Sequence, residues 1–308
     1  MKLTHSLWIV LFASLTCFAS YAHAVPDEPV CATYASEMLG KNVTYCVDRS
    51  HPELPMKAGE PIAYFMHGTN GDAGTWSKNN YAAALRALRE GQEPIPAMTF
   101  VSFDTSRYSF FMDKPGDPGA AYETWLIKEF IPYIESIYPV CNQKSCRSLI
   151  GESMGGFGAL KTSFRHADFF HAVAVNSPAL PPFSVWVRLR TWLLYFTKPH
   201  RIGPIMGDFL IKITRGLMPT EEEYEAQNPI ELATHLPLAD FPAIYFDMGG
   251  RDKYGFEVGY WIFKDALDER KIAYETCFEP KAGHDMWMRH AGDAIQFLLS
   301  HSGRPARN

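Results

Sequence analysis

The stretch SLIGESMGGFGA, residues 148–159, is the most informative part of this 308-residue chain. It contains a G-x-S-x-G motif at Gly151, Ser153 and Gly155, with one more glycine at position 156. An apolar run precedes the motif and a helix-forming stretch follows it. This context predicts a tight strand-to-helix turn that presents the Ser153 hydroxyl. Glycines are needed there because side chains would collide with the neighbouring strand and helix. The alternative is a glycine-rich turn with a bystander serine.

Apolar runs alternate with helical stretches on both sides of this motif. Six short runs rich in β-branched and aromatic residues are typical of buried parallel strands: 61–66, 98–103, 147–151, 171–175, 243–246 and 274–278. Helices are expected at roughly 76–89, 120–138, 154–166, 256–271 and 285–301. The alternation predicts an α/β fold, with a mostly parallel central sheet and helices on both faces. Functional residues are then expected in the loops past the carboxyl ends of the strands.

The N-terminal residues have the pattern of an export signal. A basic start precedes an apolar stretch at 7–18, and Ala22 and Ala24 are small residues at the two cleavage-determining positions. We therefore expect residues 1–24 to be a signal peptide and the mature chain to begin at Val25. The alternative is an uncleaved membrane anchor. An exported protein would be periplasmic or secreted, and we expect residues 25–308 to form a single domain.

Five cysteines remain in the expected mature chain: Cys31, Cys46, Cys141, Cys146 and Cys277. Export implies oxidising conditions, in which cysteines pair. Proximity in the sequence favours pairs between positions 31 and 46 and between 141 and 146, which leaves the last cysteine unpaired. Neither CxxC pairs nor histidine clusters with metal-ligand spacing occur, so no metal site is expected.

Composition excludes several classes of protein. The formal net charge is −5, so there is no excess of positive charge for binding nucleic acid. No stretch reaches the ~20 apolar residues of an ordinary transmembrane helix. Apolar side chains make up 47% of the chain, enough to bury a large core. The sequence gives no indication of the oligomeric state.

A serine hydroxyl needs a general base to become a good nucleophile, and the base needs an orienting carboxylate. In this architecture the three residues follow the chain order serine, acid, histidine. Asp252 lies in the loop past the fifth predicted strand, and Asp247, closer to the strand, is the second choice. His284 lies in the loop after the last strand, whereas His290 falls inside the final helix. The expected catalytic residues are therefore Ser153, Asp252 and His284.

An oxyanion hole needs two N–H donors, one from the residue after the nucleophile and one from the loop after an earlier strand. Met154 follows Ser153 and would supply the first donor. Residues 67–71 follow the first predicted strand and would supply the second. Both donors are backbone groups, so their side chains are not diagnostic.

Five pieces of the sequence carry a resemblance to a known family: His67-Gly68, Trp76, Gly151-Glu152-Ser153-Met154-Gly155-Gly156, Asp252 and Gly283-His284-Asp285. They resemble the esterase D-like group of α/β-hydrolases over roughly residues 61–299. That group includes S-formylglutathione hydrolases, feruloyl esterases, enterochelin-type esterases and mycolyltransferases. The resemblance implies an α/β-hydrolase fold. No cofactor is expected, because a Ser-His-Asp triad needs none. The resemblance also implies that Ser153 is the nucleophile, His284 the base, Asp252 the orienting acid and Thr69 the upstream oxyanion donor.

These observations predict an exported serine esterase that hydrolyses carboxylic esters through an acyl-enzyme. The substrate would be an ester of a small molecule, a lipid or a carbohydrate. The first alternative is an acyltransferase that passes the acyl group to a sugar or lipid alcohol. A peptidase of the same fold, and a non-catalytic binding protein on a hydrolase scaffold, are two further alternatives.

One long interruption of the strand–helix alternation, at about 178–238, predicts a lid-like insertion over the sheet. Within it, the segment 183–218 has no counterpart in the family that we could place. Four of its apolar residues recur at helical spacing: Trp186, Leu189, Leu193 and Phe196. They favour two interpretations equally. One is a lid or acyl-chain site that contacts a membrane surface, and the other is a helix packed on the sheet edge.

Overall fold

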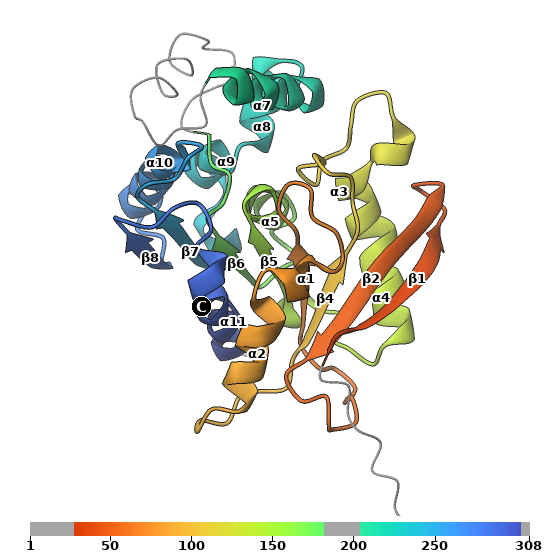
Figure 1. Cartoon of the computed structure of the whole chain (residues 1–308). Coiled ribbons are helices and arrows are strands. Elements are labelled where there is room, and N and C mark those ends of the chain that lie inside the picture. The colour runs from red at the N-terminus through yellow and green to blue at the C-terminus, as the bar shows by residue number, and fades with distance from the viewer. Residues whose placement is uncertain (1–27, 182–203, 303–308) are drawn as a thin grey trace, which may run out of the picture.

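The computed structural model describes residues 28–181 and 204–302. Eight strands form one sheet in the order β1-β2-β4-β3-β5-β6-β7-β8 (Figure 1). Their bounds are β1 Val30–Ser36, β2 Lys41–Arg49, β3 Ile62–Met66, β4 Thr99–Phe103, β5 Arg147–Glu152, β6 Ala172–Asn176, β7 Ala243–Gly249 and β8 Glu275–Glu279. The signal peptide expected at residues 1–24 lies outside the described residues.

Strands β3 to β8 are mutually parallel, which confirms the α/β fold and each of the six predicted strands to within a few residues. Strands β1 and β2 were not among the predicted strands. They form an antiparallel hairpin that continues the sheet through antiparallel pairing of β2 with β4. Most residues of β1 are exposed, so its sequence lacks the apolar run that marks a buried strand.

Helices cover both faces of the sheet because buried strands place alternate residues on opposite faces. In β3, Ile62, Tyr64 and Met66 face one part of the core, and Ala63 and Phe65 face the other. The first face packs against α3 Tyr122–Trp125, α4 Ile131–Ile137, α5 Met154–Arg165 and α10 Phe256–Glu269. The second packs against α1 Thr75–Lys78, α2 Tyr81–Arg89 and α11 Trp287–His301.

Two predicted helices differ in detail from the sequence-based expectation. The helix expected at 76–89 is two helices, because Asn80 takes a left-handed conformation with φ of 72° between α1 and α2. The helix expected at 120–138 begins at Tyr122 and contains a π-helical segment, Leu126–Phe130, between α3 and α4. The spacing of apolar residues in the sequence reveals neither the break at Asn80 nor the π-helical segment.

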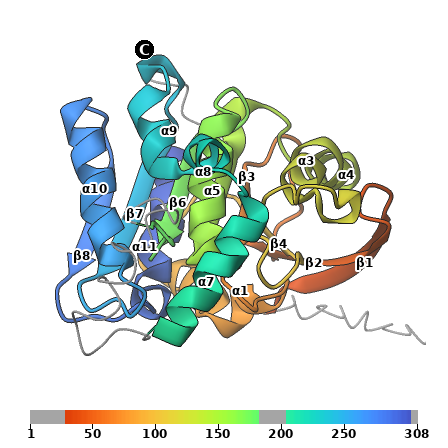
Figure 2. The ribbon, with the colours of Figure 1, turned by 90° about the horizontal axis from the view of Figure 1, so that it is seen from above.

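The described part of the insertion is helical: α7 Pro204–Leu217, α8 Glu221–Gln227 and α9 Pro229–His235. Figure 1 shows α7 at the top of the molecule, and Figure 2, the view from above, shows it crossing in front of α5. The ring of Phe209 on α7 contacts Tyr108 in the loop after β4, with 5.5 Å between centroids. Thr220 and Glu223 form a capping box that starts α8. The four residues expected at helical spacing between 186 and 196 lie outside the described residues.

The cysteine pairing follows the prediction. Cys31 and Cys46 lie opposite each other on β1 and β2 and form a disulfide, as do Cys141 and Cys146. Cys277 on β8 is free. In the ranges 28–181 and 204–302, no helix is long and apolar enough to cross a membrane. Those ranges also hold no group of three or more His, Cys, Asp or Glu side chains placed to bind a metal ion.

Candidate active site

Ser153 lies at a sharp turn between β5 and α5. Its backbone has φ of 50° and ψ of −116°, outside the regions that serine usually occupies. A Cβ on Gly155 would lie 1.8 Å from the carbonyl oxygen of Met66, and a Cβ on Gly151 would lie 2.5 Å from that of Gly155. The first and last glycines of the motif therefore permit the helix to start directly against β3 and β5.

Three loops bring Ser153, His284 and Asp252 together at the carboxyl end of the sheet. His284 lies between β8 and α11, and Asp252 between β7 and α10. Ser153 Oγ is 2.8 Å from His284 Nε2, and His284 Nδ1 is 2.5 Å from Asp252 Oδ2. The serine and the histidine are each 9% exposed, and the aspartate is fully buried. In this arrangement the hydroxyl donates to the imidazole, which donates to the carboxylate.

The Asp252 carboxylate is held by backbone donors as well as by His284. Its Oδ1 accepts hydrogen bonds from the N–H of Tyr254 at 2.7 Å and of Phe256 at 3.4 Å. Burial alone would raise the pKa of Asp252. The electrostatic interaction and hydrogen bond with His284, together with these N–H donors, nevertheless lower that pKa below its usual value. The carboxylate is therefore ionised at neutral pH.

Two other candidates from the sequence lie elsewhere. Asp247, the second choice for the acid, is fully buried on β7. It accepts hydrogen bonds from the Asn176 amide at 2.5 Å and the Ser177 N–H at 2.8 Å. Burial raises the pKa of Asp247 to about 7. His290 on α11 contacts the carboxylates of Glu279 and Asp293, as its place within a helix implies.

The turn after β3 places Thr69 in the cavity that contains Ser153. His67 is fully buried, and its Nδ1 donates to the Gly68 carbonyl at 2.8 Å. That carbonyl also accepts the Gly71 N–H at 3.0 Å. The peptide that carries the Thr69 N–H is therefore fixed through its own carbonyl group. Met154, the expected first donor, is the first residue of α5 and is fully buried.

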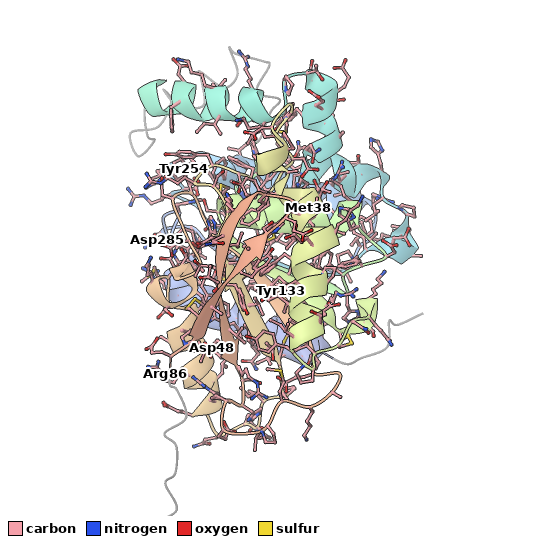
Figure 3. The ribbon with its side chains drawn as sticks, turned by 90° about the vertical axis from the view of Figure 1, so that its right-hand side faces the viewer. Met38, Asp48, Arg86, Tyr133, Tyr254 and Asp285 are labelled. Carbon is pink, nitrogen blue, oxygen red and sulfur yellow. A yellow bond between two sulfur atoms is a disulfide. The ribbon has the colours of Figure 1, made fainter. Side chains whose placement is uncertain are left out.

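The cavity around Ser153 has a volume of about 420 Å³. Arg251, Lys253 and Asp285 contribute charged side chains to its lining, and Tyr254 and Trp287 contribute aromatic ones. Tyr254 and Asp285, which come from different loops, lie on the same side of the molecule in Figure 3. No residue of α7 is among the lining residues, so the described part of the insertion does not form this cavity.

The sequence pattern does not reveal the groups that surround the His284 imidazole. The rings of Tyr254 and Trp287 contact the His284 imidazole edge-on, at centroid distances of 4.7 and 5.4 Å. The two rings cover the hydrogen-bonded pair of His284 and Asp252. A hydrogen bond that is covered from water in this way is electrostatically stronger than an exposed one. Glu152 also lines the cavity, although the sequence pattern marks it only as part of the motif. Its signal was available, since it is a charged residue between the apolar pair Leu149-Ile150 and the expected nucleophile Ser153.

Comparison with protein families identifies the chain. A family model described as "Putative esterase" matches residues 50–274, well over half of the sequence. The chain belongs to this esterase family. It is therefore a serine hydrolase that acts on carboxylic esters, as the resemblance to the esterase D-like group implies. No curated protein matches this chain significantly.

Solved structures share the fold of this esterase at low sequence identity. A ferulic acid esterase has a TM-score of 0.67 and 22% identity, covering 90% of this chain and 98% of its own. An S-formylglutathione hydrolase from Agrobacterium tumefaciens has a TM-score of 0.67 and 16% identity, covering 89% and 95%. MPT51 from Mycobacterium tuberculosis has a TM-score of 0.61 and 13% identity, covering 88% and 99%. At these identities the likeness establishes the α/β-hydrolase fold.

Proposed function

We propose that this esterase is exported and hydrolyses carboxylic esters with Ser153 as nucleophile, His284 as general base and Asp252 as orienting acid. The observation that carries the proposal is the continuous chain of hydrogen bonds from Ser153 Oγ through the imidazole to Asp252 Oδ2, at 2.8 and 2.5 Å. A positioned base and a buried carboxylate are what a serine hydroxyl needs to attack an ester.

In the first half of the reaction, Ser153 Oγ attacks the ester carbonyl while His284 Nε2 takes its proton. The N–H groups of Thr69 and Met154 bind the oxyanion of the tetrahedral intermediate. The imidazolium then gives its proton to the leaving alcohol, and the acyl group stays on the serine. In the second half, His284 takes a proton from water, which attacks the acyl-enzyme and releases the carboxylic acid.

The lining of the cavity supports a substrate class. Its charged and aromatic lining suits an ester with polar groups, such as an ester of a small molecule or a carbohydrate. The named ferulic acid esterase supports an aromatic or carbohydrate ester by analogy of fold. Contact of the 183–218 segment with a lipid surface stays one of the two interpretations of its apolar pattern.

Export is supported by the two disulfides, since such bonds persist in oxidising compartments. We propose that residues 1–24 are removed and that the mature chain, residues 25–308, acts as a single domain in the periplasm or outside the cell. N-terminal sequencing of the protein recovered from the non-cytosolic fraction tests this. A first residue of Val25 is expected, and recovery of the chain with Met1 in the cytosol contradicts it.

The catalytic proposal is tested with p-nitrophenyl esters from acetate to palmitate. Ser153→Ala is expected to lower kcat by several orders of magnitude, because the nucleophile is lost. Ser163→Ala is the matched control: Ser163 is buried on α5 and donates to the Leu160 carbonyl. It should keep kcat near the wild-type value. Undiminished activity in Ser153→Ala would refute the mechanism. Added sugar or glycerol that yields a new ester would identify an acyltransferase instead.

A further inference from the structure

Glu152 is a buried carboxyl group that the mechanism above does not use. It immediately precedes Ser153 and is only 1% exposed. Its Oε1 accepts hydrogen bonds from the Gly68 N–H at 3.3 Å and from the Asn79 amide at 2.5 Å. Its Oε2 is buried and has no hydrogen-bond partner among the described residues. Both donors therefore converge on one oxygen, and the other oxygen is free to carry a proton.

The carboxyl group lies between the two turns that would form the oxyanion hole. A Cβ added to Gly68 would lie 3.0 Å from Glu152 Oε1 and 3.5 Å from the Cβ of Ser153. Gly68 is held on both sides: Glu152 binds its N–H, and His67 binds its carbonyl. The next N–H along the chain is that of Thr69. Loss of the Glu152 contact would therefore loosen the turn that orients this donor.

The surroundings of Glu152 favour its neutral form. No Lys, Arg or His of the described residues forms an ion pair with it, and an unpaired buried carboxylate is costly. Burial raises the pKa of Glu152 to about 8, although the hydrogen bonds from Asn79 and Gly68 oppose the shift. Other titratable groups around it are Tyr81 on α2, His67 in the turn after β3, and the cavity side chains Arg251, Lys253, His284 and Asp285.

We propose that Glu152 is a positioning residue that, as a neutral carboxylic acid, ties the turn bearing Thr69 to the turn bearing Ser153. The inference rests on the proposed function, because the orientation of the Thr69 N–H matters only if this group binds an oxyanion. The neutral acid keeps its acceptor oxygen for both donors. Ionisation would add a negative charge beside the developing oxyanion and oppose its formation.

The test measures kcat and KM for p-nitrophenyl acetate from pH 5 to 10, with correction for spontaneous hydrolysis. In the wild type, kcat should fall about tenfold as Glu152 ionises at alkaline pH. Glu152→Gln keeps the acceptor oxygen and cannot ionise. It should retain kcat within about threefold of the wild type at pH 7 and lose the alkaline decline. Glu152→Leu removes the acceptor and should lower kcat by roughly tenfold to a hundredfold, with a smaller change in KM.

The matched control is Asp247→Asn. Asp247 is also a buried carboxyl group with a raised pKa, but it does not line the cavity. This variant should keep the alkaline decline. An alkaline decline in Glu152→Gln equal to that of the wild type overturns the inference, even if Glu152→Leu does not fold. An inactive Ser153→Ala beside that result leaves the proposed function intact, whereas an active Ser153→Ala overturns the proposed function itself.

Discussion

Asp247 on β7 and Asp252 in the loop that follows β7 are both fully buried aspartates, and they differ in their partners. Asp252 Oδ2 contacts His284 Nδ1 at 2.5 Å, whereas Asp247 accepts from the Asn176 amide and the Ser177 N–H. In the proposed mechanism, the contact of Asp252 with His284 Nδ1 fixes the imidazole tautomer that leaves Nε2 free to accept the serine proton. Identical side chains five positions apart should therefore have very different effects on catalysis.

We expect Asp252→Asn to lower kcat by roughly 10³- to 10⁴-fold with little change in KM, because an amide at this position favours the wrong tautomer of His284. Steady-state kinetics on a p-nitrophenyl ester measures the effect. Asp247→Asn is the matched control and should cost less than about tenfold in kcat. If the two variants lose activity equally, Asp252 has no special role as the orienting acid.

At the residue scale, position relative to a strand end was sufficient to predict which side chains meet. Ser153, Asp252 and His284 follow three strands whose carboxyl ends lie at one edge of the sheet. Glu152 was not singled out because its contacts depend on how the turn at Gly68 folds back, 84 positions earlier in the chain. A strand pattern indicates that a residue is buried, but it does not name the donors that satisfy it.

At the scale of elements, α5 is anchored by a buried ion pair as well as by its glycines. Lys161 is fully buried and donates to Glu123 Oε2 at 2.8 Å and to the Phe111 carbonyl at 2.6 Å. Arg165 also contacts Glu123. Burial alone would raise the pKa of Glu123, but the neighbouring cations lower it well below its usual value. The Glu123 carboxylate thus joins α3 to α5, and the Lys161 ammonium joins α5 to the loop after β4.

Glu123→Gln should lower the free energy of unfolding by about 3–5 kcal/mol, because it leaves the buried Lys161 ammonium without its counter-charge. Urea denaturation at pH 7 measures the loss. Since the folded pKa of Glu123 is lowered, its stabilisation is complete above the unfolded value near 4.5 and is lost as the pH falls through the lower folded value. The difference between wild type and variant should therefore shrink in acid.

The control for this prediction is Asp268→Asn, which breaks the exposed pair between Lys264 and Asp268 on α10. Solvent screens that pair, so the change in unfolding free energy should be much smaller. Equal losses in the two variants, or a Glu123→Gln difference that grows in acid, would contradict the assignment of stability to the buried pair.

Strands and helices could be predicted where buried apolar residues recur with the period of the element. They could not be predicted where the sequence has no such periodic pattern. Strand β3 is buried throughout, and its residues are correspondingly apolar. Strand β5 is also buried throughout, and its apolar residues Leu149 and Ile150 mark it. The hairpin of β1 and β2 is held at the sheet edge by the pairing of β2 with β4, and the Cys31–Cys46 bond joins its two strands. Neither contact produces a periodic pattern of apolar residues in the sequence. The break between α1 and α2 depends on one backbone angle at Asn80.

At the scale of the whole molecule, the two disulfides close loops of different length in peripheral parts of the fold. Cys31 and Cys46 are separated by 15 residues, and Cys141 and Cys146 by five. Each bond lowers the conformational entropy of the unfolded chain and so stabilises the folded state, by about 3 kcal/mol for the first bond and about 2 kcal/mol for the second. The hairpin at the sheet edge should thus gain more from oxidation than the segment before β5.

We expect the double variant Cys31→Ser, Cys46→Ser to lose about 3 kcal/mol of unfolding free energy. Thermal denaturation with and without a thiol reductant provides the measurement. Reductant should lower the Tm of the wild type and have a smaller effect on the double variant, which retains only the second bond. Cys277→Ser is the control, because Cys277 is free, and its response to reductant should equal that of the wild type. A wild-type Tm that does not respond to reductant would show that the disulfides do not contribute to stability, and would remove the main structural support for export.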